Sequence, residues 1–158
     1  MQNPAGNRRD VVPFLLFRIR QHLCGLPLHH VVEVMRPQPV EPVAGAPVGV
    51  LGAAVIRGMA LPVLDLGRLM GGADEPPTRF VTIKAGAHSV ALAVSSVVGL
   101  RPLPVGMVMD IPPLLREANE NAVAAIGALD ADLLTVLNAA HLVPESVWQA
   151  LDTSRESS

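Results

Sequence analysis

Four residues near the start of the chain carry side chains that could bind a transition metal. His22 and Cys24 lie two positions apart, and the adjacent residues His29 and His30 follow shortly after. Imidazole and thiolate are ligands that zinc prefers, but zinc sites use paired ligands at defined spacings such as CxxC or HExxH, and neither occurs here. We therefore expect turn and surface histidines beside a small buried thiol. A metal site that uses His29 and His30 is kept as an alternative hypothesis.

The sequence shows no arrangement that is typical of a catalytic nucleophile or a cofactor site. No GxSxG elbow surrounds a serine, and Cys24 falls in an apolar pattern, where cysteines mostly pack as small hydrophobic residues. The glycines at 71–72 precede a polar loop and not a helix, so they do not form a phosphate cradle. We expect a protein without catalytic residues and without a cofactor.

Two charged residues stand inside apolar runs: Glu33 in "VVEVM" and Arg57 in "AVIRGMALPV". If both side chains point inward, they should meet in a charge-assisted and bidentate bond. We expect an internal, structural ion pair that orients the hairpin around Arg57 and has no catalytic role. The alternative is that Arg57 is exposed at the turn and Glu33 lies on an edge strand.

An internal repeat runs through the chain. Residues 14–36 align with residues 80–102 at a constant offset, so that Phe14 matches Phe80. Each segment has two short β-rich runs around a polar turn, followed by a third apolar run. The order of these runs predicts a duplicated structural unit.

The segments that follow match more loosely. "VLGAAVIRGMALPVLDLGRL" resembles "AIGALDADLLTVLNAAHL", which pairs Gly52 with Gly127 and Val63 with Val136. Each unit therefore has about five strands, and five short strands can close into a small barrel that leaves no open edge. In this alignment the counterparts of Glu33 and Arg57 are Gly99 and about Asp130, so the ion pair belongs to the first unit.

These patterns predict a mainly β fold of two five-stranded barrels. We expect the first barrel at about 24–76 and the second at about 80–143, and the N-terminal strand could be shared between them. Short helices should follow Asp65 and Asn138 as N-cap residues, and a C-terminal helix should run through "PESVWQAL". The domain should cover 12–150, with a flexible N-terminus at 1–11 and a flexible tail at 151–158.

Composition limits the class of protein and its partners. Half of the 158 residues are apolar, 16% are charged, and the net charge is -2 without a basic stripe, which suits a well-buried domain and argues against nucleic acid as a partner. A single cysteine excludes an internal disulfide and fits a reducing cytoplasm. The first ten residues lack the apolar run of a secretory signal, and no apolar run is long enough to insert in a membrane.

The apolar runs around Glu33 and Arg57 can form core or line a groove for a partner helix, and periodicity alone does not separate the two. Our candidates for a partner-binding groove are Val31, Val34, Met35, Ile56 and Leu61.

The same segments resemble the CheW-like coupling domains of bacterial chemotaxis. "LPLHHVVEVMRP" is similar to the family's first-barrel pattern, and "GVLGAAVIRGMALPVLDLGRLMG" to its signature, an Asn-x-Arg-Gly turn followed by Pro-Val-Asp-Leu. The similarity continues over Phe80 to Leu100 and "AAIGALDADLLTVLNAAHL", and covers about Val12 to Trp148. Val55 stands where the family usually has the signature asparagine, and Asp130-Ala131 replaces the usual Asp-Gly turn.

This resemblance implies two five-stranded SH3-like barrels and a cytoplasmic adaptor that associates with membrane receptor arrays through its partners. The implied partners are the regulatory domain of a CheA-type histidine kinase, which contacts the first barrel, and the cytoplasmic tip of a methyl-accepting chemoreceptor, which lies in the groove between the barrels. In the family, the residues that match Glu33 and Arg57 are associated with a structural salt bridge. A self-associating CheW-like scaffold in a non-flagellar array, controlling pili or gene output, is the main alternative, and other CheW-like domains are then its partners.

Overall fold

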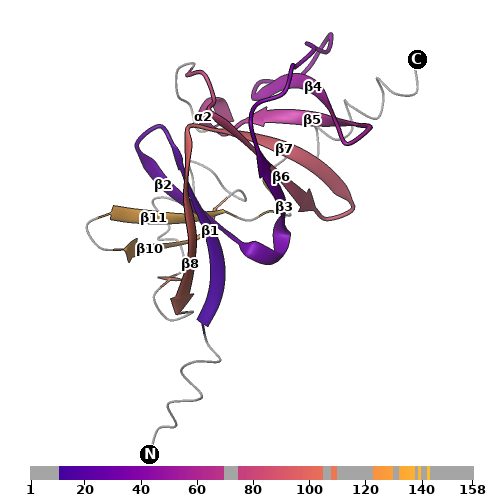
Figure 1. Ribbon diagram of the computed structural model, residues 1–158. Coiled ribbons are helices and arrows are strands. Elements are labelled where there is room, and N and C mark those ends of the chain that lie inside the picture. The colour runs from indigo at the N-terminus through magenta and orange to yellow at the C-terminus, as the bar shows by residue number, and fades with distance from the viewer. Residues whose placement is uncertain are drawn as a thin grey trace, which may run out of the picture.

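The structure is a computed structural model that describes residues 11–69, 75–104, 108–109, 123–129, 132–137, 139 and 142. It is mainly β, with two sheets and two short helical segments, η1 (Leu28–His30) and α2 (Leu66–Leu69), in its described part (Figure 1). The fold class expected from the sequence is therefore confirmed. The expected C-terminal helix and both flexible ends lie outside the described residues, apart from Val11.

The first sheet has six strands, and strands β1 and β2 from the first half of the chain lie between strands from the second half. That order is β8 (Ser96–Pro104), β1 (Val11–Ile19), β2 (His22–Pro27), β11 (Asp132–Leu137), β10 (Val123–Leu129) and β9 (Val108–Met109). Strand β9 is only two residues long. Neighbouring strands are antiparallel except β2 and β11, which are parallel.

The second sheet has five strands in the order β3 (Val31–Met35), β6 (Arg79–Ala85), β7 (His88–Val94), β5 (Met59–Asp65) and β4 (Val50–Ile56). Only the β5–β7 pair is parallel. Beyond β3 the chain returns to β4, where Glu41 and Ala53 exchange two backbone hydrogen bonds of 2.8 and 2.9 Å. This bridge joins the two edges of the sheet, as closure of a barrel requires.

The two sheets have the same strand order when each strand is replaced by its equivalent in the other half of the repeat. Strand β1 pairs with β2 as β6 pairs with β7, with Phe14 opposite Pro27 and Phe80 opposite Ala93. The first hairpin of each unit nevertheless joins the last three strands of the other unit. Each barrel therefore combines strands from both halves of the sequence. The expected limits, about 24–76 for the first barrel and about 80–143 for the second, are wrong because the hairpins are exchanged.

The exchanged hairpins are buried on both faces, which explains their continuous apolar runs. On β1, alternate side chains divide between two cores: Leu15, Phe17 and Ile19 enter one, and Phe14 and Leu16 enter another. The first of these cores lies between the sheets and also contains Ile83 and Leu92 from the five-stranded sheet. A third core fills that sheet's own barrel and includes Ile56, Val63 and Phe80. Burial on both faces of the shared hairpins therefore holds the sheets together.

Gly52 allows the close approach that closes the five-stranded sheet. A Cβ atom at this residue would lie 2.1 Å from the carbonyl oxygen of Glu41, and its φ of +150° is one that L-residues rarely adopt. The pairing register also corrects its expected counterpart: Gly52 lies opposite Val63 as Ala125 lies opposite Val136, so Ala125 and not Gly127 is its equivalent.

We expect Gly52→Ala to destabilise the protein by about 2 kcal/mol, because the added methyl group must separate β4 from the Glu41 segment and is held at an unfavourable φ. Urea unfolding followed by circular dichroism measures the change. The matched variant Gly45→Ala also has a positive φ, of 74°, but its Cβ would meet no atom within 4 Å. Equal losses in the two variants would show that contact with Glu41 does not matter.

Candidate protein-interaction site

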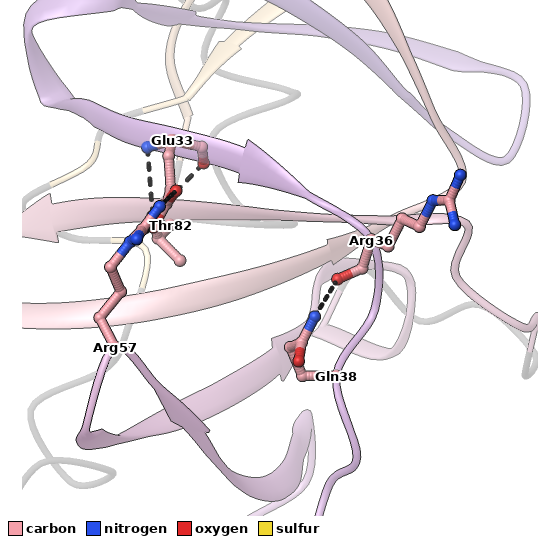
Figure 2. Close-up of polar contacts among 5 residues, drawn as sticks. All are labelled: Glu33, Arg36, Gln38, Arg57 and Thr82. Atoms are coloured by element: carbon pink, nitrogen blue, oxygen red, sulfur yellow. Dashed lines mark hydrogen bonds and ion pairs between the residues drawn. The ribbon is translucent and has the colours of Figure 1, made fainter.

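Glu33 and Arg57 form a bidentate ion pair across one end of the five-stranded sheet. Arg57 Nε donates to Glu33 Oε1 at 2.9 Å, and Arg57 Nη2 donates to Glu33 Oε2 at 2.8 Å. Figure 2 shows the arginine side chain reaching from the β4–β5 turn to the strand that carries the glutamate. The pair therefore links β3 to the tip of the β4–β5 hairpin.

We had expected the pair to lie inside the barrel, but it lies at the surface. The Arg57 side chain is 77% exposed and that of Glu33 is 24% exposed. Arg57 is part of a two-residue turn whose tip faces solvent, so its guanidinium approaches Glu33 from outside. The outcome combines the two readings of the sequence, because the bidentate bond forms although Arg57 is exposed at the turn.

The β4–β5 turn places Arg57 in an unusual backbone conformation. Arg57 has a φ of 53° and the following Gly58 a φ of 78°, and positive φ at both central residues is the mark of a type I′ hairpin turn. Glycine takes the second position without steric cost, whereas arginine at the first position is disfavoured relative to glycine, asparagine or aspartate. The ion pair to Glu33 offsets part of that cost and fixes the orientation of the hairpin tip.

A β-bulge in β3 positions Glu33. Val31 lies opposite Ile83 and Glu33 lies opposite Thr82, so Val32 is an extra residue in the strand. The buried Thr82 hydroxyl accepts a hydrogen bond from the Glu33 backbone N–H at 3.2 Å and donates to the Glu33 carbonyl at 3.3 Å. The threonine thus supplies the hydrogen bonds that the bulge removes from the ladder, as Figure 2 illustrates.

The two charges shift each other's titration. Hydrogen bonding from Arg57 lowers the pKa of Glu33 below its ordinary value of 4.5, and Glu33 raises the pKa of Arg57. A carboxyl group with a depressed pKa stabilises the folded state above its unfolded pKa. That contribution disappears as the pH falls through the folded pKa.

We expect an NMR titration of the Glu33 side-chain carboxyl to give a pKa below 4.5 in the native protein. In Arg57→Asn the pKa should return toward its ordinary value, because asparagine tolerates positive φ but cannot donate the charge-assisted bonds. The Arg36→Asn variant is the control, since the side chain of Arg36 points away from the pair in Figure 2. An unchanged Glu33 pKa in Arg57→Asn would show that the ion pair does not form in solution.

An apolar hollow of about 410 Å³ lies beside the ion pair at the same end of the sheet. Its lining consists of Val32, Glu33, Ile56, Arg57, Met59, Leu61, Thr82 and Ser89. Val32 and Met59 are 57% and 62% exposed. The hollow therefore combines an accessible apolar rim with a charged edge, the composition of a site that accepts an apolar side chain from another protein.

The five groove candidates do not form one exposed surface. Ile56 and Leu61 are buried and line the hollow, whereas Val34 is 40% exposed. Val31 is half-buried against the core between the sheets, and Met35 is half-buried against the barrel core. Only Val34 of the five is an exposed apolar residue.

Three exposed apolar residues near this site were not among the candidates: Val32, Val55 and Met59. Val32 was missed because the bulge interrupts the alternation along β3. Val55 lies two residues before Arg57, at the position where the family usually has asparagine. In the sequence it stood out only as a departure from the family pattern. Met59 begins β5 directly after the Arg57-Gly58 turn. A methionine next to a charged turn is a sequence signal that could have identified it.

The potential metal ligands do not converge. His29 and His30 lie on η1 with ring centroids 4.0 Å apart. The pKa of His30 is lowered mainly by burial and to a smaller extent by the charge of the neighbouring His29. Cys24 is fully buried between the sheets, where its thiol lies 3.8 Å from the His22 carbonyl oxygen. Among the residues that the structure describes, no three His, Cys, Asp or Glu side chains are grouped to hold a metal ion.

Burial raises the pKa of the Cys24 thiol to about 12. Because the thiolate is the reactive form, we expect native protein to react with a thiol reagent such as Ellman's reagent at pH 8 only as fast as it unfolds. Protein in urea should react at once and provides the control. Rapid reaction of the native protein would mean that Cys24 is accessible and that the core between the sheets is open.

Comparison with known proteins identifies the class of protein. The family model of the CheW-like domain matches residues 13–147. Protein FrzA of Myxococcus xanthus is 32% identical over 117 residues, which are 72% of this chain and 72% of FrzA. The crystal structure of scaffolding protein TtCheW from Thermoanaerobacter tengcongensis superposes with a TM-score of 0.74 at 20% identity, covering 80% of this chain and 88% of that one.

The chain therefore belongs to the CheW-like domain family, and it has the fold of a solved CheW scaffolding protein. Its class is that of the chemosensory coupling and scaffold proteins, as the sequence resemblance implied. The described part of the chain contains no helix with the length and apolar character that crossing a membrane needs.

Proposed function

We propose that this protein is a non-catalytic, cytoplasmic adaptor that couples chemoreceptors to a CheA-type histidine kinase in chemotaxis or a related chemosensory system. Family membership gives the class, and the geometry of the five-stranded sheet supports a binding role. The observation that carries the proposal is the apolar hollow beside an exposed ion pair, since the exposed rim residues Val32 and Met59 are available to a partner.

The kinase regulatory domain binds this end of the five-stranded sheet in our proposal. Val34 and Val55 are further exposed apolar residues, and they lie on β3 and β4, the strands that also contribute Val32 and Ile56 to the lining. Burial of such side chains in a partner is the main source of affinity at protein interfaces. Glu33 and Arg57 act as a structural pair that holds the two strands at the spacing the partner meets.

The receptor tip binds along the junction between the two sheets. Val31 of β3 and Val97 of β8 occupy equivalent positions in the repeat, and both pack half-buried against the core between the sheets. A helical hairpin presents apolar side chains at helical spacing that can follow such a junction. The adaptor thereby reaches the membrane array through its partners.

Titration calorimetry of the purified protein with each partner tests the proposal. The two ligands are the regulatory domain of the CheA-type kinase and the cytoplasmic fragment of the receptor, both from the same organism. We expect saturable one-to-one binding of each. Binding of neither fragment would overturn the proposal.

Self-association is a second candidate function, and one observation favours it. Val98 and Leu100 on β8 are exposed and are the repeat equivalents of Val32 and Val34 on β3. Both sheets thus present a similar apolar edge strand, which could pair with other CheW-like domains. Light scattering that showed a concentration-dependent increase in mass without partners would support a self-associating scaffold.

A further inference from the structure

Arg20 has a backbone conformation that side chains disfavour. It opens the turn between β1 and β2 with a φ of 60°, and the equivalent position between β6 and β7 is Gly86 with a φ of 66°. Glycine has no Cβ and takes this conformation freely, whereas arginine is strained there. Such strain persists only where surrounding contacts hold the residue in place.

Those contacts join the two sheets. The Arg20 backbone N–H donates to Ser95 Oγ at 2.6 Å, and the Ser95 N–H donates to the Arg18 carbonyl at 2.9 Å. The Arg20 Nε atom lies 3.9 Å from Glu75 Oε2. The turn of the six-stranded sheet is therefore held against residues that precede β6 and follow β7 in the five-stranded sheet.

One donor of the Arg20 side chain is left over. Its Nη2 atom is inaccessible to solvent and has no hydrogen-bond partner among the described residues, although the side chain as a whole is 30% exposed. A buried donor without an acceptor is costly, the more so for a charged group. Arg20 also lines a small cavity of about 10 Å³, a volume that suits one water molecule.

The charges around the cavity select its ligand. Asp65 and Glu75 line it together with Arg20 and Ser95. Their carboxylates disfavour an anion, and the guanidinium disfavours a cation. A neutral molecule that both accepts and donates hydrogen bonds fits these groups, and the volume restricts it to water.

We propose that this cavity binds one ordered water molecule, which accepts a hydrogen bond from Arg20 Nη2 and donates to the acceptors around it. Asp65 Oδ1 already accepts from the Arg68 backbone N–H at 3.3 Å at the start of α2. If the water donates to Asp65, it connects the β1–β2 turn to the end of β5 and the beginning of that helix. The site is separate from the partner-binding surface, and the proposal does not depend on the adaptor function.

A high-resolution crystal structure of the full chain, together with urea unfolding of variants, tests the site. We expect a water within hydrogen-bond distance of Arg20 Nη2 and of at least one oxygen of Asp65, Glu75 or Ser95. Arg20→Gly should lower the unfolding midpoint even though it relieves the positive φ. Arg20→Lys should lower it as well, because lysine keeps the charge and the strain but not the second guanidinium donor.

The reverse substitution in the equivalent hairpin measures the strain alone. Gly86→Arg adds a side chain at the same φ, where a Cβ meets no atom within 4 Å, and should lower the midpoint without any compensating contact. If Arg20 contributed only strain, Arg20→Gly would raise the midpoint by about the amount that Gly86→Arg lowers it. Such a rise, or a crystal structure without the water, would overturn the proposal.

Discussion

Phe17→Ala should destabilise this protein by about 3–5 kcal/mol, the usual range for removing a buried phenylalanine from a well-packed core. Phe17 is 0% exposed and belongs to the core between the two sheets. Its ring contributes to the packing that joins the exchanged hairpins, so its loss should lower the unfolding midpoint of the whole chain in one transition. Chemical denaturation followed by near- and far-ultraviolet circular dichroism measures the effect.

Two further variants serve as comparisons for Phe17→Ala, one in the same core and one at the surface. Ile83→Ala removes the repeat equivalent of Phe17 from the same core and should cost about 2–5 kcal/mol. Val98→Ala truncates a side chain that is 56% exposed, and should change stability by no more than about 0.5 kcal/mol. If the Phe17 variant unfolded in two separate transitions, the sheets would be independent bodies and the shared core would not hold them together.

Val34→Asp should weaken binding of the CheA-type regulatory domain roughly thirtyfold or more, which corresponds to about 2 kcal/mol. The side chain is 40% exposed on β3, the strand that also carries Val32 and Glu33 of the hollow's lining. An aspartate there would carry a charge into the apolar contact, and its desolvation would oppose association. Calorimetric titration of the variant against the regulatory domain provides the measurement.

Val48→Asp is the matched control for this binding experiment. Val48 is 81% exposed and precedes β4, so it is an exposed valine that does not lie on β3. Both variants should keep the native circular dichroism spectrum, and only Val34→Asp should lose affinity. Equal affinity of the two variants for the kinase domain would place the interface elsewhere on the molecule.

The strands of the exchanged hairpins could be predicted because they are buried on both faces. Runs such as Phe14 to Ile19 lack the alternation of a half-exposed strand, and the equivalent run in the other half of the repeat pairs in the same register. The exchange itself could not be predicted from this pattern. Each hairpin offers the same apolar faces to either unit, so the sequence does not distinguish pairing within a unit from pairing between units.

The candidate site shows the same limit in a different form. Glu33 and Arg57 drew attention because a charge inside an apolar run needs a partner, and the structure joins them. Their exposure depends on a bulge at Val32 and on positive φ at the turn, which are properties of the backbone. A bulge moves a side chain to a face that simple alternation does not assign, so Val32 was missed. Ile56 and Leu61 were groove candidates, and the structure places them as buried residues in the lining of the hollow.

The central claim is that one molecule of this protein binds a kinase regulatory domain and a receptor tip at the same time. Immobilised regulatory domain can be incubated with the receptor cytoplasmic fragment, with and without the adaptor, and the retained receptor fragment quantified. We predict retention that requires the adaptor and is lost with Val34→Asp but kept with Val48→Asp. Competition between the two fragments for the adaptor, or no retention at all, would contradict the claim.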